Sequence, residues 1–140
     1  EQGEILFGRI RPYFHKVGVA PVDGVCSTDI LVIQAEKPKY YSLVLGCVSS
    51  GMFVDYATQT SSGTKMPRAK WKILVDYPVP VPPEGLLNRY SVLIDSAVKM
   101  IRNLIFRNQV LRRGRDLLLS RLVTGELDVA DLYIPDGGPR

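Results

Sequence analysis

Apolar residues recur at alternate steps of three and four through the second half of the chain. This seven-residue repeat is typical of a helix with one apolar side, and it predicts a single helix from about Glu84 to Thr124. At ~1.5 Å per residue that helix would be roughly 60 Å long, more than the rest of a small chain could cover. The apolar seam is expected to pair with another chain as a coiled coil, through Leu87, Tyr90, Ile94, Ala97, Ile101, Leu104, Asn108, Leu111, Leu118 and Leu122.

Two polar residues within the seam bear on how the helix would pair. If Leu87 occupies the first core position of the heptad, Asn108 and Arg115 occupy the same position, and a buried Asn there costs stability while fixing register. Gly114 predicts a bend or a close helix approach, and Gly125 stands where a left-handed residue would end the helix. The alternative is a long helix that packs on its own domain.

The first half of the chain has shorter periods. Alternating or continuous apolar runs predict strands near residues 4–10, 17–22 and 29–35. Helical spacing then predicts one helix from Tyr41 to Tyr56, followed by a polar loop and an extended, proline-rich edge segment. The expected fold is α+β, a small β-rich head with a packed helix, followed by a long coiled-coil helix. The expected divisions are residues 1–83 (the head), 84–124 (the long helix) and 125–140 (an acidic tail).

Charge is unevenly spread. The net charge is +4, with a pI near 9.2, and residues 84–124 hold eight Lys or Arg against three acids. Such a balance suits a polyanionic partner, although basic residues on a long helix can equally be a solvated face. No apolar run is long enough for a membrane span and the first residues do not resemble a signal peptide, so a cytoplasmic protein without membrane contact is expected.

Catalytic patterns are missing. Cys26 and Cys47 have no second pair or nearby histidine for zinc, and both are expected to be reduced core residues. The sequence lacks the pattern of an acid followed by Glu-x-Lys with which a nuclease holds magnesium. It also lacks the glycine-rich cofactor turn of a methyltransferase and a phosphate-binding loop. His15, the single histidine, is expected to be a surface polar group. We expect no enzyme activity, no metal and no cofactor.

Two segments combine polar and basic residues. The segment "TQTSSGTKMPRAKWK" has short hydroxyl and amide side chains, a glycine that permits close backbone approach, and four positive charges, Lys65, Arg68, Lys70 and Lys72. The segment "RIRPYFHK" adds Arg9, Arg11, Tyr13 and Lys16. Such loops can hold phosphates while longer side chains reach base edges. The alternative is two ordinary solvated loops.

The order of several motifs resembles a known family. "GEILFGRIRPYFHKVGVAPVDGVCSTDILVI", "SSGTKMPRAKW", "YPVPVPPEGLLNRY" and the helix ending "LLLSRLVTGELDV" are together similar to the specificity subunit of type I restriction–modification systems, up to about Val129. The resemblance implies that residues 1–83 are a partial DNA target recognition domain and that residues 84–124 are the spacer helix joined to it. In that family two such helices pair antiparallel, and methyltransferase subunits and an endonuclease-translocase subunit, which do the catalysis, assemble on the specificity subunit.

The resemblance also implies site residues. We expect double-stranded DNA to contact Ser61, Ser62, Thr64, Lys65 and Arg68, together with Arg9, Arg11 and Lys16. From the family pattern we would expect a further part of the domain before the strand at Glu4 and a second recognition domain, and "EGLLNRY" lacks the Glu-Gln often found there. An isolated chain is expected to form a homodimer through its helix. The rival functions are a scaffold whose loops are inert, and a small nuclease or methyltransferase.

Overall fold

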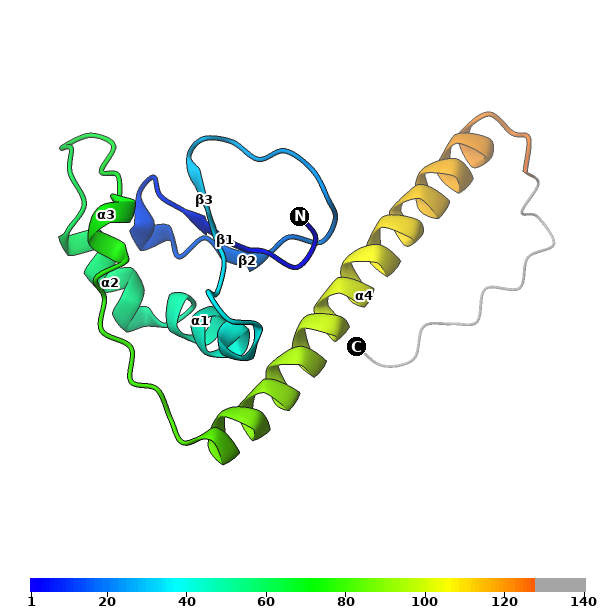
Figure 1. Ribbon diagram of the computed structural model, residues 1–140. Coiled ribbons are helices and arrows are strands. Elements are labelled where there is room, and N and C mark those ends of the chain that lie inside the picture. The colour runs from blue at the N-terminus through cyan, green and yellow to red at the C-terminus, as the bar shows by residue number, and fades with distance from the viewer. Residues whose placement is uncertain (128–140) are drawn as a thin grey trace, which may run out of the picture. The chain divides into compact units, whose positions relative to one another are not determined.

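The computed structural model describes residues 1–127. The confirmed fold class is α+β, a three-stranded antiparallel sheet with short helices followed by one long helix (Figure 1). In chain order the elements are β1 (Ile5–Gly8), the 3-10 turn η1 (Pro12–Phe14), β2 (Val17–Val19), β3 (Ile30–Ile33), the 3-10 turn η2 (Pro38–Tyr40), α1 (Tyr41–Val48), α2 (Gly51–Gln59), α3 (Trp71–Leu74) and α4 (Glu84–Val123). The predicted strands are present but shorter, and α3 was not predicted.

The sheet has the order β2-β1-β3, with β1 in the centre and antiparallel to both neighbours. Ile5 lies opposite Val19 and Ile33, while Phe7 lies opposite Val17 and Leu31. Because directly opposed residues point to the same face of a sheet, this register gathers six apolar side chains on one face. Ile5 and Phe7, at the centre of that face, are fully buried.

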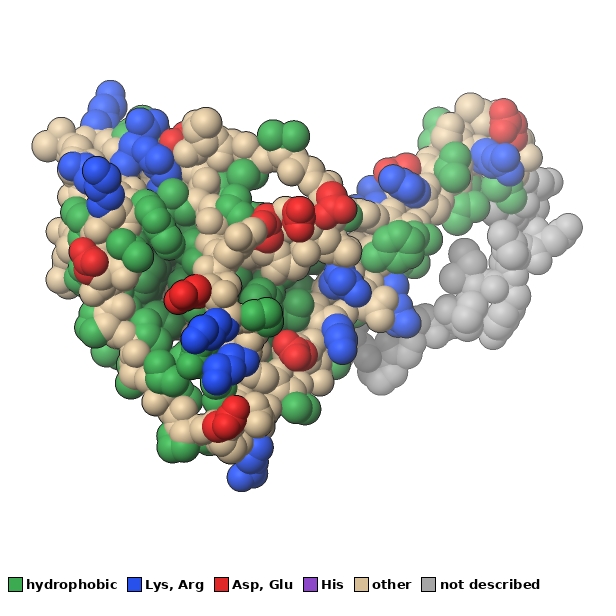
Figure 2. Space-filling model, viewed as in Figure 1, with side chains coloured by type: hydrophobic (Ala, Val, Ile, Leu, Met, Phe, Trp, Pro, Cys, Tyr) green, Lys and Arg blue, Asp and Glu red, His purple; other side chains and the backbone are tan. Residues whose placement is uncertain are grey.

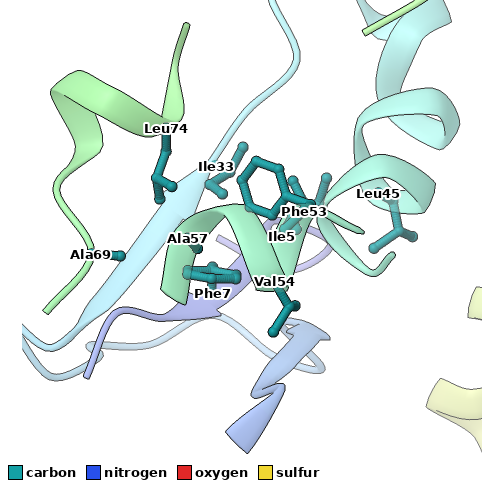
Figure 3. Close-up of a cluster of buried hydrophobic side chains, with 10 residues drawn as sticks. Ile5, Phe7, Ile33, Leu45, Phe53, Val54, Ala57, Ala69 and Leu74 are labelled. Atoms are coloured by element: carbon teal, nitrogen blue, oxygen red, sulfur yellow. The ribbon is translucent and has the colours of Figure 1, made fainter. Parts of the chain in front are cut away.

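The three short helices contribute the other side of the core. Figure 3 shows α2 beside the strands, and its Phe53, Val54 and Ala57 belong to the same buried cluster as Ile5, Phe7 and Ile33 of β1 and β3. The rings of Phe7 and Phe53 meet edge to face, with centroids 5.6 Å apart. Burial of each such large side chain stabilises the fold by ~1.5–3 kcal/mol. The remaining core side chains come from α1, α3 and the preceding loop: Leu45, Val48, Ala69 and Leu74.

The single helix predicted over residues 41–56 is wrong. The chain forms two helices, because Ser50 turns it between them: the Ser50 hydroxyl donates to the Cys47 carbonyl at 2.7 Å and accepts the Phe53 amide at 3.2 Å. A serine that begins a helix in this way satisfies an amide that the helix itself leaves unpaired. Met52, which the helical pattern placed on the buried side, is 76% exposed.

The segment between α3 and α4 is anchored at one residue. The Tyr77 ring packs against Phe53, with centroids 5.2 Å apart, and against Tyr56 at 5.0 Å. The prolines that follow Tyr77 have no amide hydrogen to donate. This segment therefore runs from α3 to α4 without pairing with the sheet. Helix α4 then begins at Glu84, directly after Pro83, as the sequence predicted.

The beginning of α4 packs on the head. Leu87 is 2% exposed, and Ile94 and Val98 are partly buried against the core cluster. Tyr90 lies over Gly46 of α1, where only a glycine leaves room for its ring. Contacts divide the chain into two compact units, Glu1–Ile101 and a second unit that begins at Arg102 inside α4. The predicted division at residues 83 and 124 stays a prediction, and most of the acidic tail, from residue 128 on, lies outside the described residues.

Three further expectations have clear outcomes. Cys47 is partly buried beside the core, but Cys26 is exposed on the loop before β3, so its prediction as a core residue is wrong. Gly114 neither interrupts α4 nor has any neighbour that its missing side chain would meet. Gly125 has φ +74°, as expected for the residue that ends the helix.

Replacing Gly46 by alanine tests the packing of α4 on the head. Alanine is favoured over glycine in a helix by ~1 kcal/mol, but a Cβ at Gly46 would collide with the Tyr90 hydroxyl and lie 3.1 Å from its Cζ. Since overpacking costs ~1–3 kcal/mol, we expect Gly46→Ala to lower the free energy of unfolding by about 1 kcal/mol in chemical denaturation. In a Tyr90→Phe background the loss should shrink.

Gly114→Ala is the matched control, since open space surrounds that helical position. It should stabilise the protein by up to ~1 kcal/mol. A Gly46→Ala variant as stable as Gly114→Ala would contradict the tight contact between α1 and α4.

Candidate nucleic-acid interface

The structure joins the two basic segments that the sequence places far apart. The Arg11 amide donates to the Pro67 carbonyl at 2.8 Å, and the Ala69 amide donates to the Arg9 carbonyl at 2.9 Å. Ile10 and Arg68 are thereby paired as antiparallel neighbours. The continuation of β1 and the α2–α3 loop therefore form one hydrogen-bonded surface, which we call the basic loop surface: residues 9–11 and 61–69.

The α2–α3 loop is also closed on itself. The Ser62 amide donates to the Arg68 carbonyl at 3.1 Å and the Arg68 amide donates back to the Ser62 carbonyl at 2.9 Å. Gly63 makes the turn possible with φ +108°, a conformation that L side chains rarely adopt. Thr64 and Lys65 are exposed on the tip of this turn.

An acidic residue borders the same surface. The Arg9 amide donates to the Asp29 carbonyl at 2.9 Å, and the Asp29 carboxylate Oδ1 lies 3.4 Å from Arg68 Nη2. Sequence reasoning did not single out Asp29, because its only signal is an acid at the start of a strand. Its position beside Arg68 depends on the pairing of β1 with β3.

Arg11 has an uncommon backbone conformation. Its φ of 49° and ψ of 64° are left-handed, which costs a non-glycine residue roughly 1–2 kcal/mol, and such strain is often found at functional sites. Its Nη2 reaches the Lys65 carbonyl at 3.5 Å. The Nε atoms of Arg9 and Arg11 are buried without a hydrogen-bond partner within residues 1–127. A ligand cannot reach these buried atoms, so an anionic group could meet only the terminal N–H groups of the two partly exposed side chains.

Two of the other predicted DNA-contact residues differ in availability. Lys16 flanks the surface: its carbonyl accepts the Gly8 amide at 2.8 Å, and its ammonium group lies 5.1 Å from the centre of the exposed Phe14 ring. The Ser61 hydroxyl is occupied, because it donates to the Thr58 carbonyl at the end of α2 at 2.8 Å. His15, as expected, is exposed, and its Nε2 lies 2.9 Å from the Ser49 carbonyl oxygen.

Figure 2 shows Lys and Arg side chains gathered at the end of the head that carries the α2–α3 loop. Only a few acidic side chains lie among them in this view. The backbone pairing described above therefore presents a predominantly positive surface. Such a surface attracts phosphate groups, and its binding should weaken as salt rises.

The residues of the predicted coiled-coil seam fall into two sets. Leu87, Tyr90 and Ile94 are buried or partly buried within the first unit. The later seam residues are exposed, and the leucine and isoleucine side chains among them have exposed fractions between 40% for Leu122 and 68% for Leu111. The exposed members are Ala97, Ile101, Leu104, Asn108, Leu111, Leu118 and Leu122.

Other kinds of site find no support in the described part of the chain. No cluster of three or more His, Cys, Asp or Glu side chains is placed to hold a metal ion among these residues. Burial raises the pKa of the Cys47 thiol, so it is less ready to act as a nucleophile. No helix up to residue 127 is long and apolar enough to cross a membrane.

Taken together, the geometry defines a two-part protein class: an α+β head with a basic, preorganised loop surface, and a long helix with an exposed apolar seam. No family model matches the sequence. The chain is 30% identical over 132 residues to the type I restriction enzyme EcoDI specificity subunit of Escherichia coli. The alignment covers 89% of this chain and 29% of that protein. The resemblance seen in the motifs is therefore confirmed: the chain is a homologue of part of a type I restriction enzyme specificity subunit.

Gly63→Ala should loosen the closed turn. The substitution adds strain at φ +108° and puts a Cβ 3.2 Å from the Met66 carbonyl oxygen, a cost of roughly 1–3 kcal/mol. We expect faster hydrogen exchange at the Ser62 and Arg68 amides, which bond across the turn. Gly24→Ala is the control, since its Cβ would meet no atom within 4 Å. Equal protection in both variants would mean that the turn does not depend on Gly63.

Proposed function

We propose that this chain is a DNA sequence-recognition component of a type I restriction–modification enzyme. In this role the basic loop surface contacts one part of a split duplex target. The chain itself is non-catalytic, and methylation and cleavage belong to partner subunits. The observation that carries the proposal is the backbone pairing of residues 9–11 with residues 67–69, which combines two basic segments into one surface in a homologue of a specificity subunit.

The basic loop surface suits duplex DNA for three reasons. Lys65 and Thr64 are exposed on a closed turn and can reach phosphates without ordering a flexible loop. Arg9 and Arg11 are partly exposed, and their terminal guanidinium N–H groups are donors suited to phosphates. Arg68 is half exposed, and its fork of donors matches the acceptors of a base edge or of a phosphate.

Helix α4 is proposed to connect this head to the rest of the enzyme. From Ile101 on, its seam exposes isoleucine and leucine side chains, whose burial would be favourable. In a complete specificity subunit a second helix would cover that seam, and methyltransferase and endonuclease-translocase subunits would assemble on the pair. In the isolated chain a second copy would take the place of the second helix, in an antiparallel homodimer.

The second candidate is a scaffold protein whose helix is its whole function. The exposed seam favours it as much as it favours the first proposal, and only the basic loop surface separates the two. A variant that alters this surface and leaves the helix intact therefore decides between them.

Charge reversal on the loop provides that variant. We expect Lys65→Glu with Arg68→Glu to weaken binding of a fluorescent 30-base-pair duplex by at least ~10-fold, measured by anisotropy with the cognate methyltransferase subunit present. Because each lost phosphate contact removes ~0.9 from the slope of log affinity against log salt, the slope should become shallower by up to about 1.8.

The matched control reverses the charge of Lys37, directly before η2, and of Lys39 within it. It makes the same change in net charge at two exposed lysines away from the basic loop surface. The control should bind DNA nearly as well as the unaltered chain. Equal effects of the two double variants would favour the scaffold.

The homodimer has its own test in Leu111→Glu. Leu111 is a seam residue and is 68% exposed in the single chain, whereas the neighbouring Val110, 51% exposed, lies on the outer side of the heptad. Burying a leucine contributes ~1.5–3 kcal/mol, and a dimer buries it twice. We expect Leu111→Glu to raise the dimer dissociation constant at least ~100-fold in analytical ultracentrifugation, and Val110→Glu to have little effect. An unaltered chain that is monomeric at tens of micromolar would contradict the dimer.

A further inference from the structure

Asp29 and Arg68 form an ion pair between segments that are distant in sequence. Asp29 precedes β3, Arg68 ends the α2–α3 loop, and Oδ1 lies 3.4 Å from Nη2. Within residues 1–127 it is the only salt bridge that joins distant segments, since the other two lie within one turn of chain. The Asp29 and Arg68 side chains are 38% and 49% exposed, so a ligand can reach both.

The backbone fixes both partners before any ligand arrives. Arg68 is bonded through its amide and its carbonyl to Ser62. The Asp29 carbonyl accepts the Arg9 amide, and the Asp29 amide donates to the Ser27 hydroxyl at 3.3 Å. An ion pair this exposed adds little to the stability of a fold. Stability of the fold therefore does not explain why backbone hydrogen bonds position both members of this ion pair.

The two groups together present donors and an acceptor side by side. Arg68 offers a planar fork of N–H donors, and Asp29 offers only acceptor oxygens. In the major groove guanine shows two acceptors, O6 and N7, and its paired cytosine shows the N4 amino donor beside them. A phosphate group shows acceptors alone, and its negative charge would be repelled by Asp29.

We propose that Asp29 and Arg68 act as one readout pair for a guanine–cytosine base pair in the major groove. Arg68 donates to guanine O6 and N7, and Asp29 accepts a hydrogen bond from cytosine N4. Lys65, Arg9 and Arg11 supply the phosphate contacts around this pair. This inference rests on the proposed DNA-recognition function and adds a base identity to it.

The test selects bound sequences from a pool of duplexes with randomised central positions. The full chain is used with its methyltransferase subunit, and the selection is repeated for Asp29→Asn and for Arg68→Lys. Asp29→Asn removes the charge at nearly the same size, and Arg68→Lys keeps the charge but loses the fork. Each variant should lose roughly 5-fold to 100-fold of the preference for guanine–cytosine, and both at the same single position of the selected motif.

Two controls distinguish base reading from general effects. Lys65→Gln should weaken binding to all sequences alike and leave the motif unchanged, as expected for a phosphate contact. Asp76→Asn makes the same acid-to-amide change at an exposed position outside the basic loop surface and should change nothing. Thermal melting of each variant verifies that the fold is intact.

The remaining outcomes overturn the inference. If Asp29→Asn and Arg68→Lys bind every sequence more weakly or more tightly by the same factor, the pair contacts phosphates or only shapes the local field. If both variants select the original motif with unchanged preference, the pair reads nothing. If the unaltered chain selects no motif although it binds the methyltransferase, the proposed DNA recognition itself fails.

Discussion

The structure depends on one strand that is hydrogen-bonded along both edges. Buried backbone amides and carbonyls must find partners, and β1 finds them in β2 on one side and β3 on the other. The hydrogen bonding continues past Gly8, where the Arg9 amide donates to the Asp29 carbonyl and the Arg9 carbonyl accepts the Ala69 amide. The core below and the basic loop surface at its end are therefore positioned by a single run of backbone, and a shift of register in β1 would displace both.

Much of the fold could be predicted from side-chain patterns, and the parts that could not have a common cause. Alternating apolar residues indicated the strands, and the heptad repeat indicated α4. The division into α1 and α2 was missed because it depends on hydrogen bonds of one serine, Ser50, within a pattern that otherwise continues. The union of residues 9–11 with 67–69 was missed for a similar reason: it is made by backbone atoms, which are alike in every residue.

The candidate site shows the same limit. Sequence alone indicated two basic loops, and it indicated them as separate features. It gave no reason to connect Asp29 with Arg68, because neither the spacing nor the type of these residues carries information about the long-range pairing. In helix α4 the sequence pattern is uniform, but the structure gives its two parts different surroundings. Leu87 and Ile94 cover the head, and the same repeat beyond Ile101 is left open, a difference that periodicity cannot express.

The exposed seam also bears on the symmetry of any DNA target. Two identical helices that pair antiparallel are related by a two-fold axis, and the heads they carry are related by the same axis. Two equal readers on a two-fold axis match a sequence that reads the same on both strands, as in other symmetric DNA-binding dimers. A specificity subunit with two different heads would instead match an asymmetric sequence. Under the proposed function, the helix that covers the face of α4 after Ile101 would determine whether the recognised sequence is an inverted repeat.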